Sequence, residues 1–443
     1  MPAIAESTLL TREQAFDSLD RVCRDSQAEG VSLSLVSGDS ALSRFASNQM
    51  TQNVQKATLK LRVTSHFGSR SASAATTDLA PEAIAATLRR SETLARIAPE
   101  DPEWLPLLEP QAYAPRAAGF DPATAACLPQ VRGQLVRQVC QLAQQAGAEA
   151  SGTLSSQAYS HALLNSRGLQ AYECSTEAEF SVTLRQGTGS SWRSRTAIAL
   201  DELPIVQLTQ AALVQAARSQ NPRDVQPGAY PTILSSAAMA ALVPWLAWNL
   251  SARAAAEGRS FFARPGGGDR QGDALFSPLM QLTRDPTHAL LQAGASDDQG
   301  LPNERLDIVR DGVLQQLNYD RYWAQQQGCQ PTGSFEPLVM AGSDRPLAEL
   351  IAETERGLLI NRAWYVRYVN PRQLELTGMT RDGTFWIEAG KIAYPVKNLR
   401  FNQSLPALLR DIDALSQVER HDDCVMPGAR VTALHFSSVT DSI

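Results

Sequence analysis

Alternating apolar and polar residues recur through the first half of the chain and predict a β-sheet. The clearest run is 54–64, where Ala57, Leu59, Leu61 and Val63 point to one side. Glycine, asparagine and aspartate between such runs favour turns, which we expect at 38–39, 48–49 and 67–68. We predict the other strands at residues 31–36, 42–46, 69–76, 153–162, 168–173 and 178–186.

Helical periodicity predicts helices that alternate with these strands, at residues 11–29, 78–97, 123–148 and 206–218. Pro81 suits the first turn of the second of these helices, and Pro99 follows its end. The segment 100–122 is rich in proline and acidic residues, so we expect an irregular surface segment there.

The second half of the chain is mostly short apolar runs and turns. A strand at 231–235 and a helix at 237–256 open it, and strands are expected from there to Leu376, including 364–369. Residues 388–391 form a loop of hairpin length between strands at 385–387 and 392–396. A helix at 405–415 and a last strand at 429–439 complete the prediction.

These elements indicate an α+β protein with two domains, which 443 residues are enough to form. Asn, Pro, Asp and Gly crowd together at 219–230, where we place the linker. We expect an N-terminal domain at residues 1–220, with helices on one face of its sheet. A larger, strand-rich C-terminal domain would occupy residues 225–443.

Charge and composition exclude several classes of partner. The formal net charge is −6 and no dense Lys/Arg run occurs, so a nucleic-acid partner is not expected. The N-terminus lacks a signal-peptide pattern, and the longest apolar stretch, 237–250, is too short to span a membrane and contains Pro244. Six scattered cysteines without a Cys-x-x-Cys pair are typical of reduced thiols in a cytoplasmic protein.

No serine-nucleophile elbow, phosphate-binding loop or dinucleotide fingerprint occurs. The five histidines lie too far apart for a two-histidine zinc site on one helix, although distant histidines could still meet in the fold. Residues 421–424 (His-Asp-Asp-Cys) are the one local cluster of metal-capable side chains, and they fit either a metal site or a solvated loop. Asp297 and Asp298 could supply carboxylates to a cleft or close a turn before Gly300.

Several short segments, in order and with suitable spacing, resemble the TldD/PmbA family, the so-called modulators of DNA gyrase. They are residues 165–169 (Asn-Ser-Arg-Gly-Leu), 258–261 (Gly-Arg-Ser-Phe), 285–286 (Asp-Pro), 297–302 (Asp-Asp-Gln-Gly-Leu-Pro), 311–314 (Asp-Gly-Val-Leu) and 388–392 (Glu-Ala-Gly-Lys-Ile). Gln299 and Ala389 depart from the family's Glu and Asn. Active members of the family are zinc peptidases, so the resemblance implies a peptidase-like fold with a peptide substrate.

The resemblance also identifies a departure at the zinc motif. Where TldD-type members carry His-Glu-x-x-x-His, this chain has Pro244, Trp245 and Asn249, and only Cys424 matches the cysteine near the C-terminus. Proline offers no ligand, asparagine is a poor one, and tryptophan cannot act as a general base. The chain therefore resembles the TldE/PmbA-like branch, which implies no catalytic residue and no metal in this chain, with zinc held by a TldD-type partner.

By the same resemblance, the chain would form a heterodimer with that partner, or a homodimer, and would act in proteolysis of extended or modified peptides. Ser260, Phe261, Asp297 and Asp298 are candidates for a substrate channel. Trp245 and Trp248, three residues apart, are expected to pack as core or partner face, or to fill the space of the missing zinc site. Two alternatives stay open: a metalloenzyme with a relocated site that uses His421, Cys424 and another histidine, and a homodimeric binding or scaffold protein.

Overall fold

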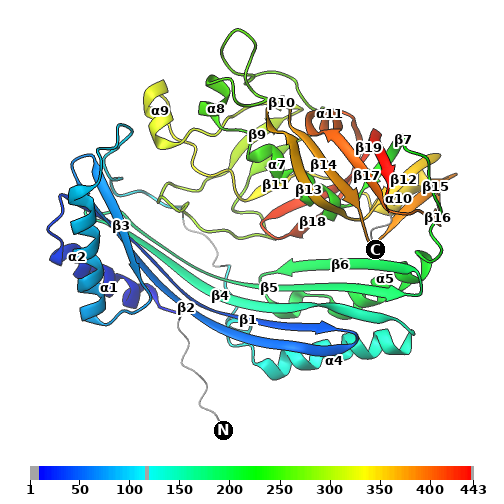
Figure 1. The fold of residues 1–443 in the computed structure, drawn as a ribbon, viewed down its shortest axis with the longest axis horizontal. Coiled ribbons are helices and arrows are strands. Elements are labelled where there is room, and N and C mark those ends of the chain that lie inside the picture. The colour runs from blue at the N-terminus through cyan, green and yellow to red at the C-terminus, as the bar shows by residue number, and fades with distance from the viewer. Residues whose placement is uncertain (1–8, 115–118, 441–443) are drawn as a thin grey trace.

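Two β-sheets with different architectures form the two halves of the chain (Figure 1), whose computed structural model describes residues 9–114 and 119–440. Over those residues the N-terminal sheet has six strands and the C-terminal sheet has thirteen. Helices accompany both, so the predicted α+β class is confirmed. No helix among the described residues is long and apolar enough to cross a membrane.

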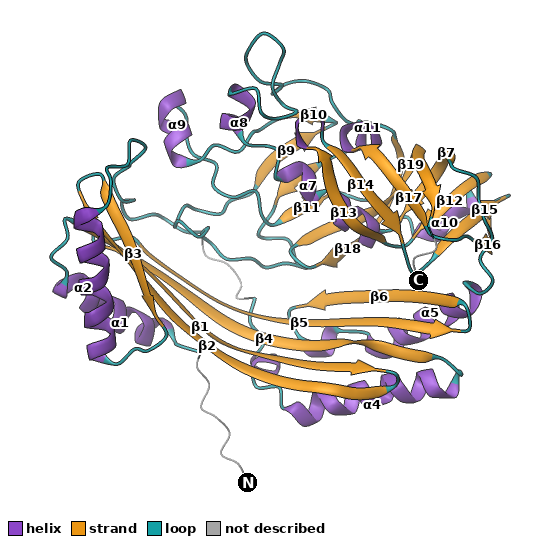
Figure 2. Cartoon of the chain, viewed as in Figure 1, coloured by secondary structure: helices purple, strands orange, loops and turns teal. Residues whose placement is uncertain are grey.

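The N-terminal sheet is antiparallel throughout, with the order β3-β2-β1-β4-β5-β6. Its strands are long and curved (Figure 2). They are β1 (Gly30–Ala46), β2 (Gln49–Phe67), β3 (Arg70–Thr76), β4 (Glu149–Asn165), β5 (Gln170–Gln186) and β6 (Gly189–Ala197).

The strand predictions in this sheet were wrong in two ways: predicted strands merge into longer ones, and one strand was not predicted. The turn expected at 38–39 does not form, because Gly38 lies within β1 and lets the backbone of β4 approach closely: a Cβ there would lie 2.3 Å from the carbonyl oxygen of Ala158. The two strands expected at 168–173 and 178–186 are one strand, β5, and β6 was not predicted. The two other turns form within one residue of their predicted positions, at 47–48 and 68–69, with Asn48 and Gly68 at positive φ.

Helices cover one face of this sheet, as predicted. Val31, Leu33 and Leu35 alternate along β1 and pack into cores that include helical residues, since successive strand side chains point to opposite faces. The opposite, concave face looks toward the C-terminal half (Figure 2). The covering helices are α1 (Arg12–Asp25), α2 (Pro81–Ile97), α4 (Pro129–Gln145) and α5 (Ile205–Arg218).

Short elements connect these helices to the strands. Helix α3 (Pro122–Ala125) and the 3-10 helix η1 (Leu200–Glu202) are single turns. The predicted helix 123–148 is therefore split in two, with α3 capped by the Asp121 side chain before α4 begins at Pro129. The described part of 100–122 before α3 is irregular, as expected, and residues 115–118 lie outside the described residues.

The C-terminal sheet follows the path β10-β9-β8-β11-β19-β7-β12-β15-β16, and β13, β14, β17 and β18 join it through β19. The long strand β19 thus connects these strands into one sheet. The strands are β7 (Gly228–Leu234), β8 (Leu282–Arg284), β9 (Leu306–Arg310), β10 (Val313–Leu314), β11 (Leu338–Met340), β12 (Arg356–Ile360), β13 (Ala363–Asn370), β14 (Glu375–Thr380), β15 (Thr384–Glu388), β16 (Lys391–Pro395), β17 (Leu399–Ser404), β18 (Ile412–His421) and β19 (Cys424–Val439).

The single helix predicted at 237–256 is broken into three. Pro244 begins a new turn, because proline cannot donate the next backbone hydrogen bond, and Ser251 caps the third piece. The helix predicted at 405–415 stops at Arg410, and β18 begins at Ile412. The helices of this half are α6 (Ser236–Leu242), α7 (Pro244–Ala247), α8 (Ala252–Ala256), α9 (Arg321–Gln327), α10 (Leu347–Ala352), η2 (Pro371–Gln373) and α11 (Leu405–Arg410).

The hairpin predicted around 388–391 is confirmed. Strands β15 and β16 pair antiparallel, with Glu388 opposite Lys391. Ala389 and Gly390 both have positive φ, as a two-residue type I′ turn requires.

Ion pairs and hydrogen bonds join the two halves at several places. Arg420 on β18 pairs with Glu177 on β5 at 2.6 Å, and Arg195 on β6 pairs with Glu419 at 2.6 Å. Elsewhere between the halves, the Arg253 guanidinium donates hydrogen bonds to both carboxylate oxygens of Glu103. The predicted domain ranges, 1–220 and 225–443, begin and end outside the described residues and stay a prediction.

Candidate functional site

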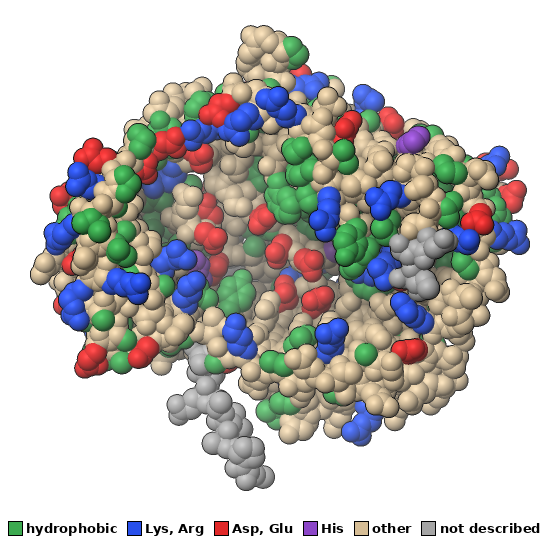
Figure 3. All heavy atoms as spheres, in the orientation of Figure 1, with side chains coloured by type: hydrophobic (Ala, Val, Ile, Leu, Met, Phe, Trp, Pro, Cys, Tyr) green, Lys and Arg blue, Asp and Glu red, His purple; other side chains and the backbone are tan. Residues whose placement is uncertain are grey.

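A cavity of about 860 Å³ lies between the concave face of the N-terminal sheet and the C-terminal half. This volume is toward the upper end of the range, roughly 300–1,000 Å³, that is typical of ligand pockets. One wall is the stretch 172–177 of β5, and loops at 291–303 and 333–337 form the other. Figure 3 shows the hollow at the centre of the molecule, with acidic side chains gathered in it.

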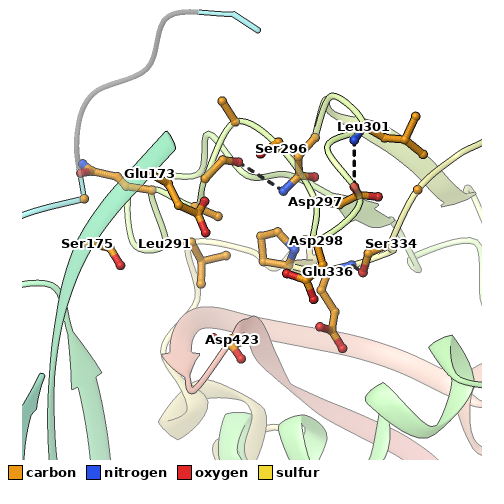
Figure 4. A pocket seen from close by; sticks show the side chains of 18 of the residues that line it. Glu173, Ser175, Leu291, Ser296, Asp297, Asp298, Leu301, Ser334, Glu336 and Asp423 are labelled. Atoms are coloured by element: carbon orange, nitrogen blue, oxygen red, sulfur yellow. Dashed lines mark hydrogen bonds between the residues drawn. The ribbon is translucent and has the colours of Figure 1, made fainter. Parts of the chain in front are cut away.

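Carboxylates dominate the charged side chains that line this cavity. Two arginines, Arg321 and Arg420, are the cations among its described lining residues. In Figure 4 the side chains of Asp298 and Glu336 lie close together above β18 and β19, and Asp423 lies at the turn between these two strands. The seven acidic residues that line the cavity are Glu173, Glu177, Asp297, Asp298, Asp320, Glu336 and Asp423.

Both arginines are already occupied by the protein itself. Arg420, whose side chain is only 7% exposed, pairs with Glu177 and donates to the carbonyl oxygens of Leu290 and Asp422. Arg321 donates to the carbonyl oxygen of Pro106 at 2.6 Å. The cavity is therefore strongly acidic, and it would favour a ligand that brings positive charge or hydrogen-bond donors.

Burial raises the pKa of several of these carboxyl groups. It raises the pKa of Glu173 to about 7, with a further contribution from nearby Asp298. Burial also raises the pKa of Glu336, helped by Asp423 and Asp298. For Glu177, burial raises the pKa although the positive charge of Arg420 opposes it.

Asp297 and Asp298 have different roles in the segment singled out from the sequence. The side chain of Asp297 accepts hydrogen bonds from the backbone N–H groups of Gln299 and Leu301, both at 2.9 Å, and Gly300 has a φ of +88°. The predicted turn is thus confirmed. Both aspartates also line the cavity, and their assignment to a substrate channel stays a prediction.

The residues aligned with the missing zinc motif are engaged in packing. Trp245 on α7 packs edge-on against Trp248 and against Tyr368 of β13, with ring centroids 4.9 and 4.7 Å apart. The Tyr368 hydroxyl donates to the backbone carbonyl of Trp245 at 2.6 Å. Pro244 starts α7, and Trp248 is 63% exposed. Trp245, Trp248 and Tyr368 therefore form a partly exposed aromatic cluster, with Trp248 at its exposed edge.

Both polar atoms of the Asn249 side-chain amide form hydrogen bonds. Its Nδ2 donates to the carbonyl oxygen of Pro371 at 2.9 Å, and its Oδ1 accepts from the Ser260 hydroxyl and the Phe261 N–H at 2.9 and 3.1 Å. Ser260 also donates to the Asn249 carbonyl oxygen at 2.8 Å. Ser260 and Phe261, predicted as channel residues, are brought against Asn249 and are not among the residues that line the cavity.

The cluster 421–424 forms the tight turn between β18 and β19. The Cys424 thiol contacts the His421 carbonyl oxygen at 3.2 Å, and burial, with Asp422 and Asp423, raises the pKa of this thiol to about 12. The thiol is therefore protonated at neutral pH and is a poor metal ligand in this state. Over the described residues, no group of three or more His, Cys, Asp or Glu side chains is placed to hold a metal ion.

His421 lies in a polar cluster that superficially suggests a catalytic triad. Its Nε2 lies 3.0 Å from the Ser236 hydroxyl and 3.7 Å from a carboxylate oxygen of Glu419, to which Ser236 also donates. In a triad the carboxylate binds the other ring nitrogen and so orients the histidine toward the serine. Here both partners lie at one nitrogen, and Ser236 and His421 are buried, so the cluster fits a structural role.

Reasoning from the sequence missed the β5 wall and Glu336, and it considered Asp423 only within the candidate metal cluster 421–424. A signal was present, since Glu173, Ser175, Glu177 and Glu179 alternate with less polar residues. Such a pattern predicts a strand with one acidic face. The division of β5 into two predicted strands concealed it.

Comparison with known proteins agrees with this architecture. Residues 227–438 match the PmbA/TldA metallopeptidase C-terminal domain. The chain is 24% identical over 422 residues to a protein named metalloprotease PmbA from Escherichia coli O157:H7, covering 91% of this chain and 90% of that protein.

Solved structures share the fold across nearly the whole chain. TldE from Thermococcus kodakarensis superposes with a TM-score of 0.88 at 17% identity, over 95% of this chain and all of that one. A protein described as a modulator of DNA gyrase from Bacteroides thetaiotaomicron gives 0.84 at 20% identity, over 97% and 100%. The resemblance seen in the sequence thus agrees with the domain match, the relative and the shared fold, and residues 227–438 form a C-terminal domain of the PmbA/TldD family.

Proposed function

We propose that this chain is a non-catalytic, TldE/PmbA-like subunit of a zinc metallopeptidase complex that acts on extended or modified peptides. The zinc and the catalytic groups would come from a TldD-type partner in a heterodimer. The chain's own contribution would be to shape the space that receives the peptide. Cytoplasmic residence is part of this proposal, on the scattered cysteines alone.

One observation carries the proposal: the positions aligned with the zinc motif are committed to the protein's own structure. Asn249 uses its amide to hold Pro371, Ser260 and Phe261. Trp245 packs in an aromatic cluster with Tyr368 and Trp248. A zinc site needs ligands freed from such contacts and a surrounding set of groups that orient them.

The test is to purify the chain alone and together with a TldD-type chain that carries His-Glu-x-x-x-His. We expect the two chains to co-purify, zinc to follow the partner, and chelator-sensitive hydrolysis of unfolded peptides to appear only in the complex. Hydrolysis by the chain alone, with stoichiometric zinc, would instead favour a relocated metal site. A stable homodimer that never binds the partner would favour the scaffold alternative.

A triple variant tests the structural reason directly. Pro244→His, Trp245→Glu and Asn249→His would place the family's zinc residues on this chain, yet we expect little peptidase activity. The chain lacks the surrounding groups that would hydrogen-bond to the new zinc ligands and orient them. In addition, removal of the Trp245 side chain opens the aromatic cluster. Robust, zinc-dependent turnover by this variant would contradict the argument.

Cys424→Ala tests the one remaining position that matches the active members of the family, which lies outside the segment 244–249. Since the thiol is buried and protonated, we expect turnover by the complex to stay nearly unchanged. A large loss of turnover, with the complex still assembled, would give Cys424 a chemical role.

A further inference from the structure

The carboxyl group of Glu173 reaches from β5 to the loop 291–303 on the other side of the cavity (Figure 4). A Cβ built at Gly294 of this loop would overlap Oε2 of Glu173 and would lie 2.7 Å from its Cδ. The carboxyl group therefore occupies the place that a side chain at position 294 would take. Since Glu173 belongs to the N-terminal half and Gly294 to the C-terminal half, this contact joins the two halves inside the cavity.

Among the described residues, the groups that face this carboxyl group give it little positive charge at neutral pH. On β4, His161 lies 3.9 Å away, but burial lowers the pKa of this histidine, and its other ring nitrogen lies 2.9 Å from the Ser34 hydroxyl. Tyr159 on β4 is near enough to interact with the charge of Glu173, and burial raises the pKa of its hydroxyl, which is therefore neutral. On the loop itself, Asp298 adds a second negative charge.

Other charged groups farther along the cavity add to this negative charge. Glu336 on the loop 333–337 and Asp423 at the turn of β18 and β19 are both carboxylic acids, and burial raises the pKa of Glu336, with further contributions from Asp423 and Asp298. The two arginines among the described lining residues are bound elsewhere in the protein. Ionisation of Glu173 would therefore place one more negative charge against the loop, where no described cation is positioned to balance it.

The loop has a second attachment to the N-terminal half that does not titrate near neutral pH. The Tyr113 hydroxyl donates to the Gly300 carbonyl oxygen at 2.7 Å, and burial, with Asp297, raises the pKa of Tyr113 to about 12. Leu169 packs against the same glycine, since a Cβ at Gly300 would lie 2.6 Å from its Cδ2. The loop can therefore loosen at Gly294 and stay attached at Gly300.

We propose that Glu173 and Gly294 form a proton-controlled latch: the protonated carboxyl group holds the loop 291–303 against β5, and its ionisation loosens the loop at Gly294 and widens the cavity. The proton passes to the solvent. Two effects oppose the ionised form in the closed position, its poor hydration there and the negative charge of Asp298. Release relieves both, because the carboxylate then reaches water. The latch acts on the cavity of this chain alone, so it goes beyond the proposed function and does not depend on a partner.

The direction of the pH dependence follows from the two positions of the loop. The closed position raises the pKa of Glu173 to about 7, and in the released position the group returns toward its ordinary value of 4.5. The equilibrium constant for release therefore rises by up to about tenfold per pH unit between these two values, and it levels off above about pH 7. From pH 5.5 to pH 8 it should increase at least about tenfold.

Hydrogen exchange of the loop amides, followed by mass spectrometry on the purified full-length chain, tests the latch. In the closed loop the Ala293 N–H donates to the Pro286 carbonyl oxygen at 2.9 Å. The Asn303 N–H donates to the Ala295 carbonyl oxygen, also at 2.9 Å. Loosening of the loop exposes such amides, so their protection, corrected for the intrinsic effect of pH on exchange, should fall at least about tenfold from pH 5.5 to pH 8. Equal protection at the two pH values would overturn the inference.

Two substitutions at the latch distinguish it from a contact that does not respond to pH. Glu173→Gln keeps the size of the side chain but cannot ionise, so the loop should stay protected at both pH values. Gly294→Ala puts a methyl group in the place of the carboxyl group, so the loop should exchange quickly at both. Glu388→Gln, which changes an exposed residue outside the cavity, is the matched control and should follow the wild type. A Glu173→Gln variant that keeps the wild-type pH dependence, or a Gly294→Ala loop as protected as the wild type at pH 5.5, would contradict the latch.

Discussion

Glu173 shows how burial and neighbouring charge act together on one residue. Its carboxyl group lies on the cavity wall, 26% exposed, with Asp298 nearby and His161 at 3.9 Å. Burial also lowers the pKa of His161, so this histidine offers little positive charge to offset the carboxylate at neutral pH. The raised pKa of Glu173, about 7, therefore makes its ionised form costly in the folded protein.

Glu173→Gln should reveal this cost as a dependence on pH. Between the ordinary carboxyl pKa of 4.5 and about 7, the folded protein keeps a proton that the unfolded chain has lost, so stability falls as pH rises through this range. Relative to the wild type, the variant should gain about 1–3 kcal/mol between pH 5 and pH 8. Denaturant unfolding at several pH values measures this gain.

Glu388→Gln provides the control for that experiment, because Glu388 is exposed on β15 outside the cavity. Its stability should follow the wild type at every pH. If Glu173→Gln also runs parallel to the wild type from pH 5 to pH 8, the carboxyl group of Glu173 is not perturbed by its surroundings.

At the scale of elements, glycines mark where strands approach closely as well as where the chain turns. Gly38 and Gly152 lie inside β1 and β4, and a Cβ at Gly152 would lie 2.0 Å from the Ser181 carbonyl oxygen. Such glycines allow long strands to bend and to keep their pairing. The sheet can therefore curve around the cavity.

Gly38→Ala should destabilise the protein by about 1–3 kcal/mol, since its Cβ would meet the Ala158 carbonyl oxygen and the Tyr159 backbone at 2.3 and 2.8 Å. Gly133→Ala is the matched control. Gly133 lies within α4 with no atom within 4 Å of the added Cβ, so the change should stabilise the protein by about 0.5–1 kcal/mol. Thermal or denaturant unfolding distinguishes the two, and a stabilised Gly38→Ala would disprove the close approach.

Local sequence patterns predicted the type of most elements and failed where distant contacts decide. Pattern alone located the β15–β16 hairpin, because its turn residues act locally. The helix predicted to 415 failed because 412–415 pair with β19, a contact that periodicity cannot reveal. The cavity could not be predicted for the same reason: β5 and the 291–303 loop meet only in the folded chain. Asp297 and Asp298 were found because they lie in a recognisable turn.

At the scale of the molecule, ion pairs link the two halves around the cavity. Arg420 is the most buried of the linking cations, and it contacts Glu177 on one side of the cavity and the Leu290 and Asp422 carbonyls on the other. Removing one partner of such a pair leaves the other charge without compensation. The position of the halves should therefore depend on this residue more than on exposed pairs.

Arg420→Met should cost about 3–5 kcal/mol and widen the molecule as measured by small-angle X-ray scattering. Arg310→Met, which breaks the exposed pair with Asp307, should leave both the stability and the radius of gyration nearly unchanged. If the two variants are equally mild, the halves are held by packing and the other links, and Arg420 is dispensable.

The early end of β6 also bears on how the protein behaves when crowded. An unpaired strand edge on an outer surface invites pairing between copies and, with time, aggregation. Among the described residues, no strand pairs with the stretch of β5 beyond β6 on the side away from β4, and this stretch lines the cavity and faces the C-terminal half. The C-terminal half therefore covers this part of β5 in the intact chain, and an N-terminal half released by proteolysis would lose that cover and should precipitate more readily than the intact chain.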